Sequence, residues 1–140
     1  MKKIYLYWML LLTFSIQSQT LTLSEQAKVS VLTCGTTSEL YALFGHTGIR
    51  IADPKYGIDM VYNYGAFDFN TPDFYTKFIK GDLLYFIGVD DYEDFVGNYV
   101  YDKRSVSEQF LNITPLQKQK IYEELKNSFG TEAAFYQYKF

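Results

Sequence analysis

The stretch LFGHTGIRIA, residues 43–52, organises the sequence and contains its only histidine, His46. From residue 47 onward, apolar residues alternate with small or polar ones, which predicts a strand with Ile49 and Ile51 on one face. The other face then carries His46, Gly48, Arg50 and Ala52. Two of these four residues are small, so we expect open space that a ligand or another segment of the protein can enter. A histidine at the start of a strand, beside such space, suits a general base, although a lone histidine is more often structural.

The first residues have the plan of a secretory signal peptide. Met1-Lys2-Lys3 is basic, residues 4–16 are mostly apolar, and residues 17–19 are small or polar. The apolar run is short for a membrane span, so we expect cleavage after Ser18, and an uncleaved anchor is the alternative. The sequence therefore predicts an exported protein, periplasmic or associated with the cell envelope, with one small domain at 19–140.

Composition argues against several classes of function. The net charge is −3, and the adjacent basic pair Lys103-Arg104 follows an aspartate, so nucleic-acid binding has no electrostatic support. The single cysteine, Cys34, allows no internal disulfide, and one histidine with one cysteine argues against a zinc site. We expect no metal and no cofactor. The 14 tyrosines and 12 phenylalanines fit a β-rich core, and they also fit a wet groove or a membrane-facing rim.

Turn residues divide the domain into short elements, which predicts an α+β fold: a small antiparallel sheet with short flanking helices. The expected strands are 29–34, 46–52, 58–64 closed by Gly65, 83–89, 105–113 and one that begins at residue 135. The expected helices are 38–44, one from Thr71 to Gly81, one that follows Asp90 or Asp91, and 114–129.

Capping residues and periodicity give more specific expectations. Ser38 is expected to cap the first helix, and Gly45 to end it in a left-handed turn. Pro72 fits the first turn of the second helix, and Thr114 with Gln117 forms a capping box for the last one. The run 83–89 is nearly all apolar, which predicts a central strand buried on both faces. The inward-facing helical residues are expected to be Phe74, Tyr75, Phe78, Ile79, Leu116, Ile121, Tyr122 and Leu125.

Seven segments of the sequence carry a family resemblance. They are LTCG (32–35), ELY (39–41), LFGHTGIR (43–50), VYNYGAFDF (61–69), PDFYTKF (72–78), RSV (104–106) and LNITP (111–115). With these segments in this order, the chain resembles the N-terminal periplasmic domain of the Lnb-type lipoprotein N-acyltransferases. The resemblance covers roughly residues 27–140, and its most specific part is the pair of motifs around His46 and Asn63.

The resemblance implies a fold and an activity. The family looks like a circularly permuted papain-like fold, similar to lecithin:retinol acyltransferase. In that arrangement a histidine lies early on a strand, a polar residue on the next strand orients it, and a nucleophilic cysteine comes later in an Asn-Cys pair at a helix N-terminus. Members move an acyl chain from a phospholipid to the amino group of a lipoprotein's first cysteine. The implied partners are therefore phospholipid, lipoprotein and the membrane surface.

Carried over residue by residue, the resemblance makes His46 the general base. Asn63 or Tyr64 on the partner strand is expected to orient its imidazole, and the sequence does not decide between them. Arg50 is expected either to bind a phosphate or carboxylate or to face solvent. Cys34 is expected either to pair with His46 as a thiol nucleophile or to be a small buried residue.

One departure from the family pattern is that the Asn-Cys segment, expected just after the final strand, does not occur in residues 1–140. The sequence also stops inside a β pattern at Phe140, so we expect it to be part of a longer protein. Whether the chain is an enzyme is left open. The two hypotheses are a thiol acyltransferase domain with His46 as base, and a non-catalytic secreted module that binds lipid or an envelope protein.

Overall fold

A computed structural model describes residues 21–138, and the expected signal peptide lies outside the described residues. Six strands form one sheet in the order β5-β1-β2-β3-β4-β6, and every neighbouring pair is antiparallel. The strands are β1 (Lys28–Cys34), β2 (His46–Asp53), β3 (Ile58–Phe67), β4 (Tyr85–Asp91), β5 (Val106–Phe110) and β6 (Phe135–Tyr136). The helices of the described residues are α1 (Phe74–Lys80), α2 (Tyr92–Tyr101) and α3 (Pro115–Ser128), with short 3₁₀ turns η1 (Leu40–Ala42) and η2 (Glu132–Ala134). The predicted α+β class with an antiparallel sheet is confirmed.

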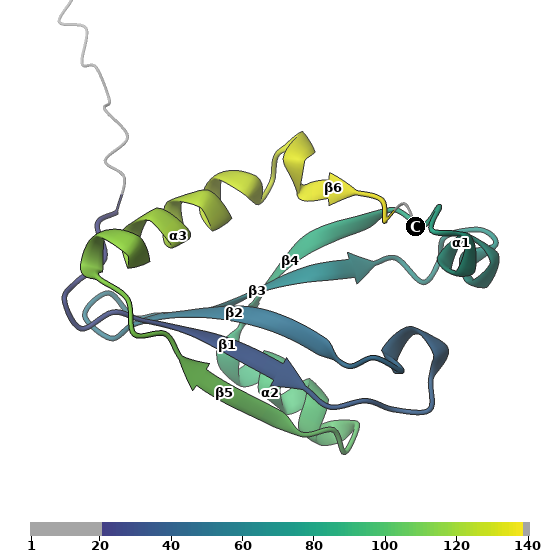
Figure 1. The fold of residues 1–140 in the computed structure, drawn as a ribbon, viewed down its shortest axis with the longest axis horizontal. Coiled ribbons are helices and arrows are strands. Elements are labelled where there is room, and N and C mark those ends of the chain that lie inside the picture. The colour runs from purple at the N-terminus through teal and green to yellow at the C-terminus, as the bar shows by residue number, and fades with distance from the viewer. Residues whose placement is uncertain (1–20, 139–140) are drawn as a thin grey trace, which may run out of the picture.

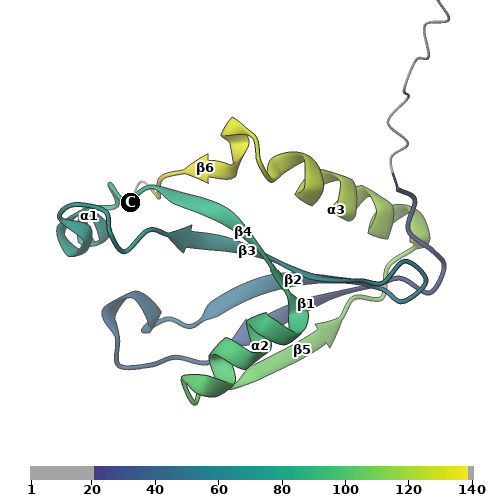
Figure 2. The same ribbon diagram turned by 180° about the vertical axis from the view of Figure 1, so that it is seen from behind.

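The sheet has a helix on each face. α3 lies over one face, whereas α2 lies against the other, as the front and back views show (Figures 1 and 2). Under α3 the buried core consists of Val29, Ile51, Tyr62, Tyr122 and Leu125. Under α2 it consists of Leu32, Cys34, Val61 and Phe95. Because side chains alternate along a strand, β1 and β3 each contribute to both cores.

The two strands expected at 46–52 and 58–64 form a hairpin of β2 and β3 at the centre of the sheet. Part of the space expected beside His46 is filled by another segment of the chain. A Cβ atom on the buried Gly48 would lie 2.8 Å from Cγ1 of Val61 and 3.5 Å from the ring of Phe95. The glycine therefore lets α2 pack closely against β2, and the space that remains lies nearer to His46.

Two predicted helix starts are wrong. The segment after Ser38 forms only the 3₁₀ turn η1, whose N-cap is Glu39, and no side chain caps it. The second helix begins at Phe74, after Asp73 in a left-handed conformation with φ 57°, which aspartate tolerates better than most residues. Pro72 therefore precedes α1 instead of lying in its first turn.

The predicted stop at Gly81 and the capping box are confirmed. Gly45 has the predicted left-handed conformation, but the 3₁₀ turn before it already ends at Ala42. Gly45 and Gly81 have φ values of 75° and 73°, and Gly81 donates to carbonyls in the last turn of α1. At α3, the Thr114 hydroxyl accepts from the backbone N–H of Gln117, and the Gln117 side chain accepts from the backbone N–H of Thr114.

Three expected inward-facing residues are exposed. Leu116 is 80% exposed, and Tyr75 and Ile79 are also exposed. Leu116 lies in the first turn of α3, before the positions that meet the sheet. α1 packs through Phe74 and Phe78 against a small aromatic cluster, so the other side of this two-turn helix is left to solvent.

The main differences from the predicted strands concern β3, β4 and β5. Gly65 does not close β3, which continues to Phe67 through an irregularity in its register with β4 after Tyr64. β4 is not a central strand buried on both faces. One of its sides pairs with β3, but the other pairs with only the two residues of β6. β5 ends at Phe110, well before the predicted end.

Candidate active site

His46 is the first residue of β2, at the end of the sheet where β1 ends and β3 runs out (Figure 1). Gly45 positions it: a Cβ atom there would lie 2.6 Å from the carbonyl oxygen of Cys34, so the chain can turn this tightly only at glycine. The His46 side chain is half-buried and borders a cavity of about 270 Å³. The cavity is lined by Tyr41, Ala42, Gly45, His46, Asn63, Gly65, Ala66, Phe67, Phe69, Tyr99 and Arg104.

Three polar side chains form a chain across neighbouring strands. Nε2 of His46 on β2 is hydrogen-bonded to Oδ1 of Asn63 on β3. Nδ2 of Asn63 donates in turn to Oδ2 of Asp90 on β4, at 3.2 Å. The sequence predicts Asn63 as one of two candidates, whereas Asp90 was expected only at the start of a helix.

The hydrogen bonds among these three side chains determine which imidazole nitrogen of His46 carries the proton. A carboxylate only accepts hydrogen bonds, so Asp90 takes the NH₂ side of the Asn63 amide, and the amide oxygen is left for His46. An amide oxygen only accepts, so Nε2 of His46 must donate. The neutral ring then has its lone pair on Nδ1, which is the nitrogen available to accept a proton.

Asn63, and not Tyr64, contacts His46. The two residues are adjacent on β3, so their side chains point to opposite faces of the sheet. Tyr64 is exposed, and its ring centroid lies 6.3 Å from that of Tyr136 at the edge of the sheet. The structure therefore decides between the two candidates that the sequence leaves open: Asn63 contacts His46, and Tyr64 does not.

Cys34 lies directly opposite His46 in the register of β1 and β2, on the face that α2 covers. The thiol is buried, and burial raises the pKa of Cys34, although a hydrogen bond with Tyr99 and the charge of Arg104 act in the other direction. A raised pKa keeps the group as the thiol, which is the poorly nucleophilic form. This environment is that of a structural cysteine.

Arg50 is neither solvent-facing nor free to receive a ligand. Its Nε and Nη2 atoms donate to the two carboxylate oxygens of Asp59 at 2.7 Å, and Nη1 donates to Glu108 at 2.9 Å. The guanidinium lies 3.4 Å from the centroid of the Tyr92 ring, and the side chain is 16% exposed. Two carboxylates already neutralise this cation, so its contacts tie β2 to β3, β5 and α2.

A second cavity of about 240 Å³ adjoins the first and shares Asn63, Tyr99 and Arg104 with it. Its lining also includes Asp90 and Asp102. Sequence reasoning missed Asp90, Tyr99 and Arg104. Asp90 lies two residues after Gly88, and Gly88 is the residue opposite Asn63 on β4. This places Asp90 near Asn63, but only the register of the two strands shows it.

Within residues 21–138, no three histidine, cysteine or acidic side chains gather as a metal site would require. The same part of the chain has no helix with the length and apolar character to cross a bilayer.

The comparison with protein families decides the assignment. The model of the Lnb N-terminal periplasmic domain matches residues 17–140. The chain belongs to the Lnb N-terminal periplasmic domain family. It is therefore an exported, periplasmic Lnb domain, as the signal-like leader and the sequence motifs predict. Searches of curated proteins and of solved structures found no match.

Proposed function

We propose that this Lnb domain supplies the general base of a cell-envelope thiol acyltransferase, with His46 in that role. The observation that carries the proposal is the hydrogen bond from Nε2 of His46 to Asn63, which leaves Nδ1 as the proton acceptor beside a cavity. The substrates that fit the family resemblance are a phospholipid as acyl donor and the amino group of a lipoprotein's first cysteine as acceptor.

In the first half-reaction, Nδ1 of His46 accepts the proton of a cysteine thiol. The thiolate attacks the ester carbonyl carbon of the donor, the C–O bond breaks, and the imidazolium returns the proton to the departing alkoxide. In the second half-reaction, the acceptor amine attacks the thioester carbonyl carbon and His46 removes the amine proton. The C–S bond then breaks, and the imidazolium returns the proton to the departing thiolate. In both half-reactions the Asn63 oxygen accepts the hydrogen bond from Nε2 of His46. This bond keeps the ring in one orientation and stabilises the imidazolium when it forms.

The reacting thiol in this proposal is not that of Cys34, because Cys34 is buried and its pKa is raised. The topology suits a cysteine from a segment that follows β6. β6 pairs antiparallel with the start of β4, so it runs toward the end of the sheet where His46 lies (Figure 1). Residues that follow β6 in a longer chain would therefore begin close to the cavity.

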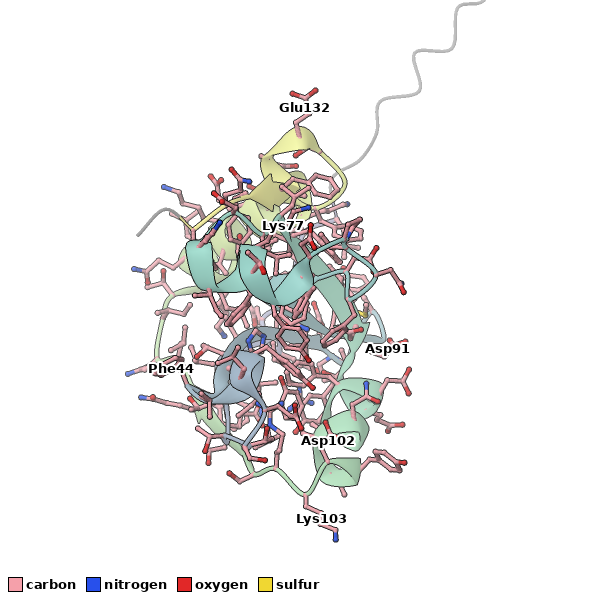
Figure 3. The ribbon with its side chains drawn as sticks, turned by 90° about the vertical axis from the view of Figure 1, so that its right-hand side faces the viewer. Phe44, Lys77, Asp91, Asp102, Lys103 and Glu132 are labelled. Atoms are coloured by element: carbon pink, nitrogen blue, oxygen red, sulfur yellow. The ribbon has the colours of Figure 1, made fainter. Side chains whose placement is uncertain are left out.

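The proposed partner also includes the membrane surface. Large apolar side chains are exposed on the segments around the cavity: Leu40, Leu43, Phe44, Phe69, Tyr75 and Ile79, here called the apolar rim. Figure 3 looks onto this end of the molecule, with α1 in front and Phe44 at one side. Phe44 is 95% exposed, and α1 adds Lys77 and Lys80 in its last turn. Apolar side chains with nearby cations are the composition that inserts into an anionic interface.

The proposal is tested with the full-length gene product in cells that depend on it for lipoprotein acylation. His46→Ala should leave lipoproteins without the N-linked acyl chain, as read by mass spectrometry of their N-terminal peptides. Thr47→Ala is the matched control, because Thr47 is exposed and points to the opposite face. Normal acylation in the His46→Ala cells, with the protein present at its usual level, would overturn the proposal.

A further inference from the structure

Arg104 is held in a fixed orientation between the two cavities. Its Nε atom donates to the carbonyl oxygen of Gly35 at 2.8 Å, and its guanidinium lies 4.5 Å from the centroid of the Tyr99 ring. Its backbone N–H donates to the carbonyl of Tyr99 at 2.8 Å. An arginine anchored at Nε and stacked on an aromatic ring has little freedom left to lose when its terminal N–H groups bind an anion.

No carboxylate of residues 21–138 lies within ion-pair distance of the Arg104 guanidinium. Both ion pairs found there are made by the other arginine, Arg50, with Asp59 and Glu108. The terminal nitrogens of Arg104 donate to no group of residues 21–138, and the side chain lines both cavities. A half-buried cation without a carboxylate is costly unless an anion or water completes its hydrogen bonds.

The two cavities differ in the charge that they accept. The lining of the second contains the carboxylates of Asp90 and Asp102, which repel an anion. The first, beside His46, has no acidic residue in its lining and adds the apolar side chains of Phe67 and Phe69 to Arg104. An anion with an attached apolar group therefore fits the first cavity better than the second.

We propose that Arg104 binds the phosphate of an amphiphilic substrate in the His46 cavity, with the apolar part of that substrate against Phe67 and Phe69. The inference rests on the proposed function for the identity of the amphiphile, a phospholipid acyl donor. It deepens that function by assigning the donor phosphate to Arg104, and it gives Arg50 no part in binding.

The test is calorimetric binding of a monomeric short-chain phosphatidylglycerol to the purified full-length protein. Arg104→Gln should weaken binding at least about tenfold, because charged hydrogen bonds to phosphate are lost. Arg104→Lys keeps the charge but loses the Gly35 anchor, and it should bind with intermediate strength. Lys103→Gln removes the same charge from the neighbouring residue, which points away from the body of the protein (Figure 3), and should bind like wild type.

Two further ligands separate the sources of the anion. A diacylglycerol with the same short chains should bind weakly and equally to wild type and Arg104→Gln. Inorganic phosphate should bind far more weakly than the phospholipid, and equal affinity would overturn the assignment to a lipid. Undiminished phospholipid binding by Arg104→Gln, with thermal unfolding showing a folded variant, would overturn the proposal. Binding is measured without acyl transfer, so a failure of the proposed catalysis would not be mistaken for a failure of this site.

Discussion

The side-chain oxygen of Asn63 accepts a hydrogen bond from Nε2 of His46 across two neighbouring strands. The amide can face His46 with its oxygen because Asp90 engages its nitrogen from the next strand. Three strands of the sheet thus specify one tautomer of one imidazole, with Nδ1 left as the proton acceptor. A rigid sheet is a suitable support for such an arrangement, since its backbone holds the three side chains in register.

Asp90→Asn should release the Asn63 amide, because the new amide at residue 90 donates as well as accepts. We expect the proportion of His46 with the proton on Nδ1 to rise, and acyl transfer to fall about tenfold, the equivalent of one hydrogen bond. The protein has a single histidine, so ¹⁵N spectra of histidine-labelled protein at alkaline pH report the tautomer directly. Asp91→Asn is the control, since Asp91 is exposed. An unchanged tautomer in Asp90→Asn would show that Asp90 does not orient Asn63.

Cys34 should be unreactive in the folded protein. Burial raises its pKa and shields the sulfur, so we expect thiol reagents to label it at a rate limited by opening of the structure. Labelling is followed by mass spectrometry with and without urea, and Cys34→Ala should retain acyl transfer by the full-length protein. Rapid labelling without urea, together with loss of transfer in Cys34→Ala, would make Cys34 the nucleophile instead.

Asp53 should make stability depend on pH in the acid range. Burial alone would raise the pKa of its carboxyl, but hydrogen bonds from Ser24 and Lys55 outweigh burial and lower it. A lowered folded-state pKa stabilises the protein above the unfolded value of about 3.9, and this stability is lost as pH falls through the folded-state pKa.

Asp53→Asn should therefore lower the free energy of unfolding by about 1–3 kcal/mol near neutral pH, and by less in acid. Urea unfolding at a series of pH values measures the difference. Equal destabilisation at every pH would show that the Asp53 charge is not what Ser24 and Lys55 stabilise.

The apolar rim should bind lipid surfaces. Phe44→Ser removes a ring that is 95% exposed, so the fold should be unaffected while partition to anionic vesicles falls several-fold. Vesicle sedimentation measures the partition. Tyr101→Ser is the matched control, because Tyr101 is 88% exposed on α2, away from the rim. Equal losses in the two variants would remove the specific role of the rim.

The sequence predicts the architecture well where local chemistry decides it. The alternation in β2, the left-handed conformation of Gly45 and the capping box at Thr114 each depend on a few neighbouring residues, and the structure confirms each. The errors arise where tertiary packing decides. α1 starts late, after Asp73 in a left-handed conformation, and it exposes Tyr75 and Ile79 because only one side of it meets an aromatic cluster.

The site is predicted in part for the same reason. His46 and Asn63 lie in recognisable motifs. The choice between Asn63 and Tyr64, however, requires knowing which face of the sheet each side chain of β3 points to. Asp90 becomes a partner only through the register of β4 against β3. Arg50 appears free in sequence because its two acidic partners, Asp59 and Glu108, come from other strands.

The central claim, that His46 is the base of an acyl transfer, is tested most directly by the transfer rate of the purified full-length protein carrying His46→Gln. The assay uses a phospholipid donor and a lipopeptide with a free N-terminal cysteine amine. The account predicts a rate at least about 10²-fold below wild type, with phospholipid binding retained. A His46→Gln protein that transfers the acyl chain at the wild-type rate would contradict it.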